Sequence, residues 1–376
     1  MQPREVSVPK SNKSEGENTV LLGKSLDLNQ LMSAINKRIP ENQMSSQVKE
    51  MGEYFLDLGK NSDISIIGAS GSGKSNTLNR ILVGIAKKKH SNILVIDPKG
   101  EHRGLAWKFK WQVFAFAKDS QADALNISLP TESDEDRRVL ADLVQEWLTQ
   151  NGYTGTSVLK ERIYSILSSH KGEKPSLSSI VDFLMSDPEL AEVGQRLRKN
   201  LIQKGVLSKV LSLQDSSQSF LGKSVLLDLS GRGLKDPTSK EERLFLATLL
   251  IWKITTLNVK DSIIVIEDVM DRFKVESLRL KMVSMFRQLK ARGNRLIITS
   301  RSECRDLLGE EKIELVHRLS GEKTIADQLS EYDTNIPAEV LTRMVSLMPR
   351  GYVITSRLAG RQSEAVAVDS MDFGID

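Results

Sequence analysis

Short apolar runs alternate along the chain with longer segments in which apolar residues recur every three or four positions. The short runs predict buried strands, and the longer spacing predicts helices. The predicted core strands are 54–58, 64–67, 92–97, 111–116, 225–229, 263–266 and 295–299. Helices predicted over 241–256 and 275–292 separate the last three strands. Nearly continuous apolar strands alternating with helices favour an α/β fold, with a mostly parallel sheet covered on both faces.

Between residues 133 and 221 the pattern changes to helical spacing alone. The helices predicted there are 136–149, 157–168, 177–185 and 190–211. We therefore expect a helical insertion subdomain over 133–221. It would divide the α/β core into a first part, 19–132, and a second part, 222–376.

The two ends of the chain carry weaker patterns. Residues 1–18 are polar and predict a disordered tail. Apolar residues at helical spacing predict a helix over 28–39, which Pro40 ends. Near the C-terminus, apolar runs at 352–355 and 365–368 predict a closing β-hairpin.

Composition adds only coarse limits. At 376 residues, with 39% hydrophobic and 27% charged residues, the chain resembles an ordinary globular protein of one large or two average domains. No apolar run approaches the roughly 20 residues that span a bilayer, so we expect no membrane span. The single cysteine, Cys304, and the absence of a signal-peptide core favour a cytoplasmic location. The net charge of +4 fits a nucleic-acid partner only if positive residues cluster locally.

A phosphate-binding loop follows the apolar run 64–67 and precedes a helix-prone segment. In such a loop, glycines let successive N–H groups point at one anion, and the new helix adds its positive dipole end. Lys74 would reach the β- and γ-phosphates, and the Ser75 hydroxyl would ligate Mg²⁺. We therefore predict ATP and Mg²⁺ as cofactors, the alternative being a Gly/Ser-rich turn without a ligand. The predicted nucleotide-binding residues are Gly68, Ala69, Ser70, Gly71, Ser72, Gly73, Lys74, Ser75 and Asn76.

Two carboxylates, Glu267 and Asp268, directly follow the apolar strand 263–266. A phosphate loop needs one carboxylate that positions Mg²⁺ and another that activates water. One of the two would hold Mg²⁺, for which Glu267 is the candidate together with Ser75, and the other would orient the attacking water. The alternative is a pair of acids that merely ends a strand where solvent begins.

Three further candidates lie at the ends of predicted elements. Ser300 closes the strand 295–299, where it could sense the γ-phosphate. Glu101, after the strand 92–97, is either a reserve catalytic base or a residue of a solvated turn. Arg292 is either an arginine finger for a neighbouring subunit or a cation that favours a helix C-terminus.

Two patterns point to no site. The segment 229–233 looks like the signature motif of transport-type ABC ATPases, but it follows a strand instead of opening a helix. The histidines are scattered along the chain and predict no metal-ligand pattern. They are His90, His102, His170 and His317.

Taken together, these motifs resemble the HerA/FtsK superfamily of DNA-pumping P-loop ATPases, and HerA most closely, over roughly residues 56–368. The segment Asp97-Pro98-Lys99-Gly100-Glu101 is also similar to that of type IV coupling proteins, which feed DNA into conjugation machines. The other matching pieces are the phosphate loop, residues 227–231, the acidic strand end and residues 349–354.

The resemblance implies a RecA-like P-loop NTPase fold. It also implies a homo-oligomeric ring, a hexamer, around double-stranded DNA, with ATP between subunits and Arg292 acting in trans. Pore loops would grip the phosphates by charge, independently of sequence. The implied function is an ATP-hydrolysing, helicase-type DNA translocase for DNA processing, transfer, segregation or packaging, with a nuclease as one conceivable partner.

Two departures from the family motifs support another hypothesis. The family usually has Asp followed by Glu at the acidic strand end, whereas this chain has Glu267 followed by Asp268. The sensor position carries Ser300 where the family usually has Gln. A nucleotide-gated ring or docking ATPase with slow hydrolysis, controlling a protein partner, is therefore one alternative, and a motor for a secretion or pilus system is another. Basic residues of the insertion form either a DNA or partner surface or a solvated helix face: Arg196, Arg198, Lys199 and Lys204.

Overall fold

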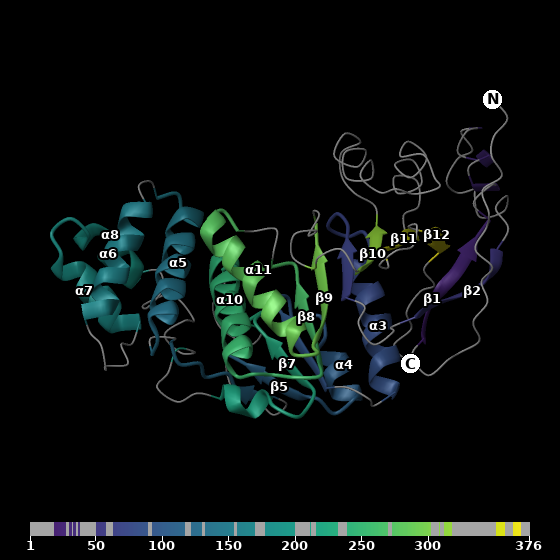
Figure 1. Cartoon of the computed structure of the whole chain (residues 1–376), viewed down its shortest axis with the longest axis horizontal. Helices are drawn as coiled ribbons and strands as arrows, with labels where there is room; N and C mark the ends of the chain where they lie inside the picture. Colours follow the sequence, from purple (N-terminus) through teal and green to yellow (C-terminus); the bar gives the residue numbers. More distant parts are fainter. Residues whose placement is uncertain are drawn as a thin grey trace. The chain divides into compact units, whose positions relative to one another are not determined.

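In the computed structural model the chain divides into two units, residues 1–91 with 295–376 and residues 92–294 (Figure 1). The predicted tail over 1–18 lies outside the described residues, as does most of the helix predicted over 28–39. Within that helix Gln30, Leu31, Ser33 and Ala34 are described, and they are helical. The structure describes residues 19–27, 30–31, 33–34, 37, 50–57, 63–88, 92–116, 122–129, 132–153, 156–169, 177–199, 211, 216–231, 239–269, 273–301, 308, 312–317, 351–357 and 364–369.

The first unit is built around β3 (Asp63–Ile67), whose five residues are all buried. Parallel neighbours flank it, β9 (Arg295–Ser300) on one side and β10 (Lys312–His317) on the other. Antiparallel strands continue beyond β10 in the order β11, β12, β1, β2. Their bounds are Gly351–Arg357, Glu364–Asp369, Thr19–Leu26 and Glu50–Asp57, respectively.

Helix α3 (Lys74–Lys88) follows β3 after the phosphate loop. Its buried apolar residues recur three or four positions apart, which gives the helix one apolar face: Leu78, Ile81, Leu82 and Ile85. Arg80 is also buried, and its guanidinium donates to the carbonyl of Leu22 in β1 at 2.6 Å. The helix that carries the loop is therefore fixed by both apolar packing and a buried polar contact.

The second unit contains a sheet whose strand pairs are all parallel, in the order β8, β4, β7, β5, β6. In parallel strands the carboxyl ends meet at one edge. Asp97 ends β4 opposite Asp228, which ends β7, and Glu267 ends the neighbouring β8. This edge therefore gathers three carboxylates. The bounds are Ser262–Glu267, Asn92–Asp97, Val225–Asp228, Gln112–Ala115 and Asp123–Ala124 for β8, β4, β7, β5 and β6.

The other regular elements described in the second unit are helices. The insertion comprises α5 (Asp134–Gln150), α6 (Thr156–Ser169), α7 (Leu177–Ser186) and α8 (Ala191–Leu197). The other helices are α4 (Arg103–Lys108), the short 3-10 helix η2 (Ser217–Phe220), α10 (Lys240–Thr256) and α11 (Glu276–Ala291). Ser133 and Ser239 start α5 and α10 with capping boxes, which satisfy the first N–H groups of each helix.

The predicted α/β fold is confirmed, with a mostly parallel sheet, a helical insertion and a C-terminal hairpin of β11 and β12. One predicted helix, 190–211, is wrong at its end. Helix α8 ends at Leu197, and Leu211, the last residue of the predicted helix, instead forms a parallel bridge with Ile127; residues 200–210 lie outside the described residues. Strands β1, β6 and β10, helix α4 and the short helix η2 were not predicted. Among the described helices, none has both the length and the apolar composition needed to cross a membrane.

Candidate nucleotide site

The phosphate loop spans residues 68–73, between the end of β3 and the start of α3. Gly71 and Gly73 have φ values of 77° and 97°, a backbone conformation that glycine adopts without steric cost. Both glycines are exposed, as is Ser70. Gly68 anchors the start of the loop, since its N–H donates to the carbonyl of Ser300 at 3.1 Å. The loop thus presents its exposed main chain at the N-terminus of a long helix, where anions bind.

Lys74, the first residue of α3, folds back onto the loop. It is 5% exposed, and its Nζ donates to the carbonyls of Gly68 at 2.7 Å and Ala69 at 3.2 Å. Ser75, which follows on the first helical turn, is half-buried. A buried ammonium, glycine main chain and a hydroxyl at a helix start are the donor set that fits a nucleotide phosphate with Mg²⁺. No residue between positions 68 and 76 is acidic.

Ser300 and His317 flank the loop within the same unit. Ser300 is fully buried at the end of β9, where it pairs with Ile67. His317 ends β10, and its Nδ1 lies 2.9 Å from the carbonyl of Ser72. Burial, together with the smaller effect of the charge of Lys74, lowers the pKa of His317 to about 4, while the hydrogen bond to Ser72 acts in the opposite direction. A neutral imidazole donating from Nδ1 therefore braces the loop, a role that the sequence did not reveal.

The acidic strand end lies in the second unit. Glu267 and Asp268 are both buried, and Asp268 has a φ of 47°, which turns the chain as β8 ends. Lys99 lies between the two carboxylates, with its Nζ 2.6 Å from Asp268 Oδ2 and 3.7 Å from Glu267 Oε1. Burial lowers the pKa of Lys99, but the charges of Glu267 and Asp268 and the hydrogen bond to Asp268 outweigh burial and raise it. Both acids therefore have a positive partner within the chain.

A histidine also joins this cluster. His102 is fully buried, and its Nε2 lies 3.3 Å from Glu267 Oε2. Asp97, His102 and Glu267 place potential ligand atoms within 4.8 Å of one another. The prediction that no histidine belongs to a cluster of metal-ligand type is therefore wrong for His102, because the fold joins residues 165 positions apart.

The titration of this cluster follows from burial and charge. Burial raises the pKa of Asp97 to about 6; His102 opposes this shift, and the charges of Glu267 and Asp228 add to it. Burial lowers the pKa of His102, but its hydrogen bond to Glu267 and the charge of Asp97 raise it overall. Buried charges are costly unless they are paired. The two carboxylates therefore favour the protonated, charged form of His102, and a charged His102 favours the ionised form of the carboxylates.

The remaining candidates lie apart from these contacts. Glu101 is exposed. Arg292 follows α11 directly, and its guanidinium donates to the carbonyl of Thr255. In the insertion, Arg196 pairs with Glu192 and Arg198 pairs with Asp182, as expected for a solvated helix face. Lys204 lies outside the described residues.

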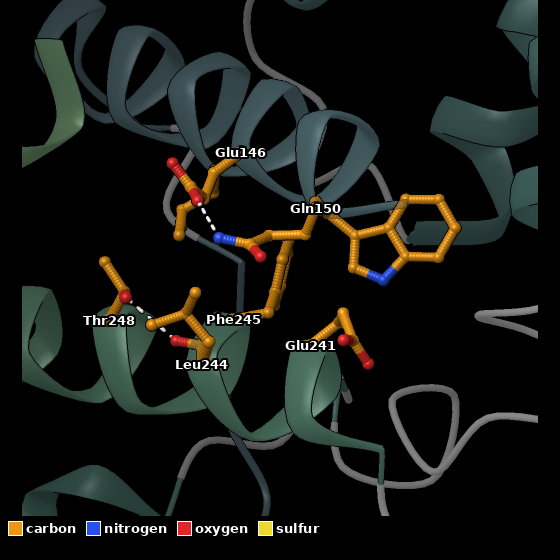
Figure 2. Close-up of a pocket in the computed structure, with 8 residues that line it drawn as sticks. Glu146, Gln150, Glu241, Leu244, Phe245 and Thr248 are labelled. Atoms are coloured by element: carbon orange, nitrogen blue, oxygen red, sulfur yellow. Dashed lines mark hydrogen bonds between the residues drawn. The ribbon is translucent and has the colours of Figure 1, made fainter. Parts of the chain in front are cut away.

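A small hollow between α5 and α10 has an empty volume of about 200 Å³, including space open to solvent. Figure 2 shows Glu146 and Gln150 of α5 hydrogen-bonded on one side and Leu244 and Phe245 of α10 on the other. The hollow lies between two packed helices of the second unit.

The fold and the phosphate loop define a P-loop NTPase of the RecA-like class. The profile of the family described as "Helicase HerA, central domain" matches residues 53–241, just over half of the chain. The chain therefore belongs to this family, and the resemblance predicted from the motifs is confirmed.

Two solved structures share the fold over nearly their whole length. VirB4 of Thermoanaerobacter pseudethanolicus is 13% identical with a TM-score of 0.60, and the match covers 96% of this chain and 98% of VirB4. The bacterial conjugative coupling protein TrwBdeltaN70 is 10% identical with a TM-score of 0.52, and the match covers 97% of both chains. A search of curated proteins gave no match.

Proposed function

We propose that this chain hydrolyses ATP in a homo-oligomeric ring, a hexamer, and uses the energy to move double-stranded DNA. The phosphate loop carries the proposal, because Lys74 and the exposed glycines form a complete phosphate-binding element in a chain of the HerA helicase family. The shared fold of a conjugative coupling protein is in keeping with this proposal.

Each site residue has a proposed role. Lys74 exchanges the carbonyls of Gly68 and Ala69 for phosphate oxygens, and Ser300 senses the γ-phosphate at the end of β9. Ser75 and Glu267 hold Mg²⁺, which supplies positive charge against the phosphates when bound. Asp268 orients the attacking water and accepts its proton. Arg292 reaches a neighbouring subunit.

The first test is steady-state ATP hydrolysis by the full chain with and without long double-stranded DNA, with Lys74→Ala as the blank. We expect turnover that DNA stimulates several-fold and that the variant abolishes. DNA binding should also weaken steeply with salt, because phosphate contacts release counterions. Tight ATP binding with negligible turnover that DNA does not change would contradict the motor.

A second candidate is a nucleotide-gated ring that hydrolyses slowly and controls a protein partner. The contact of 2.6 Å between Lys99 Nζ and Asp268 Oδ2 favours it, because the ammonium occupies an oxygen of the carboxylate that would have to orient the attacking water. In a gate, Lys99→Met would raise basal turnover and DNA would still have no effect. In a motor, DNA would already stimulate the turnover of the wild-type chain.

A further inference from the structure

The segment from Asp97 to His102, which we name the β4 loop, is organised by its own first residue. Asp97 accepts hydrogen bonds from the N–H groups of Lys99 at 3.0 Å, Gly100 at 2.7 Å and His102 at 2.9 Å. Gly100 has a φ of 70°, and a Cβ on it would lie 2.6 Å from Ser230 Oγ. The buried carboxylate of Asp97 therefore fixes the backbone conformation of the β4 loop.

The β4 loop holds both oxygens of Glu267. His102 Nε2 lies 3.3 Å from Oε2, and Lys99 Nζ lies 3.7 Å from Oε1. Glu267 and His102 are 1% and 0% exposed, whereas the side chain of Lys99 is 30% exposed. A buried carboxylate keeps one orientation when its hydrogen-bond partners are themselves fixed. His102 meets this condition, since it is buried and its own main chain is held by Asp97.

We propose that His102 is a positioning residue, which fixes the Glu267 carboxylate in the orientation that serves Mg²⁺. The inference rests on the proposed function. Carboxylates that ligate metals are usually hydrogen-bonded by outer partners, whose loss costs about 10–100-fold in metal affinity or activity. Lys99 does not replace His102, because it is farther from Glu267 and also pairs with Asp268. In this proposal the β4 loop acts on Glu267 through His102, and the exposed Glu101 takes no part.

The test measures the gain in affinity that Mg²⁺ gives to ATP binding, without relying on turnover. The dissociation constant of a fluorescent ATP analogue, mant-ATP, is measured for the full chain in EDTA and in excess Mg²⁺. In His102→Leu we expect the affinity in EDTA to be unchanged and the Mg²⁺-dependent gain to fall by about tenfold or more. His102→Gln, whose amide nitrogen can take the place of Nε2, should retain most of the gain. His102→Asn is too short and should lose it.

A matched control is Lys160→Met, which removes an ion pair of 2.8 Å with Asp142 in the same unit and should leave the gain unchanged. Thermal denaturation of each variant reports folding. If His102→Leu does not fold, the Gln and Asn variants decide: a larger gain with Gln supports the inference, and equal gains overturn it.

The inference and the proposed function fail in different ways. If wild type shows the gain and His102→Leu keeps it, the positioning role is wrong and the ATP site stands. If wild type binds no nucleotide, or binds it without any gain from Mg²⁺, the proposed function fails first.

Discussion

Gly68 lies where the phosphate loop leaves β3, in contact range of two side chains. A Cβ on Gly68 would lie 2.5 Å from Ser72 Oγ and 2.6 Å from His317 Cβ. The Ser72 hydroxyl could rotate away, but His317 Cβ is bonded directly to the backbone of β10. We therefore expect Gly68→Ala to lower stability by about 1–3 kcal/mol, as overpacking does. It should also weaken ATP binding by about tenfold, which corresponds to about 1.4 kcal/mol.

Thermal denaturation and calorimetric titration with ATP measure both effects. Gly104→Ala is the control, because a Cβ there meets nothing within 4 Å and the residue lies in α4. It should be neutral or stabilise the protein by up to about 1 kcal/mol. A Gly68→Ala protein as stable and as tight-binding as wild type would show that the loop is not braced by His317.

The depressed pKa of His317 predicts how stability depends on pH. Its ordinary pKa of 6.5 falls to about 4 in the folded chain. Between these values the unfolded chain binds a proton that the folded chain does not. Stability from the neutral imidazole is therefore complete above pH 6.5 and is lost as the pH falls toward 4, by up to about 1.4 kcal/mol per pH unit.

Urea denaturation of wild type and His317→Leu at pH 7, 6 and 5 tests this dependence. The difference between the two proteins isolates His317, because other groups, such as Asp97 with its raised pKa, titrate in both. Wild type should lose stability more steeply than the variant below pH 6.5. Parallel curves would mean that His317 does not titrate with folding.

The sequence could predict only those site residues that belong to local motifs. The predicted positions of Lys74, at a helix start, and of Glu267, at a strand end, agree with the structure. His102 and His317 could not be predicted, because their contacts join residues 165 and 245 positions apart. The one local signal for His102 was its place directly after the segment Asp97–Glu101. Of the residues near the end of that segment, only Glu101 was predicted as a site residue.

At the scale of elements, α5 of the insertion provides the cap of α11. Val275 starts α11 without a side-chain cap of its own. Glu146, 2% exposed, accepts instead from the N–H groups of Val275 at 2.7 Å and Lys274 at 2.9 Å. A carboxylate at a helix N-terminus makes charge-assisted hydrogen bonds and favours the dipole. Glu146 therefore ties the insertion to the helix that follows the acidic strand.

We expect Glu146→Ala to lower the free energy of unfolding by about 2–3 kcal/mol, because two N–H groups lose a charged partner. Glu146→Gln, which keeps one acceptor oxygen, should cost less. Amide hydrogen exchange at Lys274 and Val275 should accelerate in step with the loss. Glu135→Ala on the same helix is the control: it removes an ion pair with Lys281 in which the Glu135 side chain is about half-exposed, and it should change stability by less than about 1 kcal/mol. Equal effects of the two Ala variants would contradict the capping role.

Element predictions succeeded where the local pattern and the tertiary environment agree. The helix predicted over 241–256 is α10, Lys240–Thr256, with the start differing by one residue. Strand β10 was missed because three of its six residues are charged or histidine: Lys312, Glu314 and His317. Glu314 and His317 are nevertheless buried, since β10 pairs with β3 on one side and β11 on the other. That environment depends on strand pairing, which no local pattern contains.

At the scale of the whole molecule, the family could be predicted but the assembly could not. The ordered set of motifs indicated the HerA family, and the family match confirms it. The ring depends on surfaces of other copies, which neither the periodicity nor the fold of one chain specifies. Arg292 is the residue with which the ring can be tested. Within the chain its guanidinium donates to the carbonyl of Thr255. Action in trans requires that this contact be given up.

If Arg292 is an arginine finger, Arg292→Ala should lower kcat by about 10³-fold or more. If it only ends α11, turnover should stay near that of wild type. Mixing separates these cases, because in a ring each subunit presents one surface to the next. Lys74→Ala subunits bind no ATP but keep Arg292, and Arg292→Ala subunits bind ATP but lack the finger. Two inactive proteins should therefore regain activity when mixed.

The matched control mixes Arg292→Ala with the double variant Lys74→Ala/Arg292→Ala, which can donate no arginine and should restore nothing. Activity that returns only with the single variant requires both a ring and a finger supplied by the neighbour. An Arg292→Ala protein that stays active in isolation would leave Arg292 as the residue that closes α11 on Thr255. The γ-phosphate would then need another cation, and Arg301, directly after Ser300 on β9, would be the first to replace.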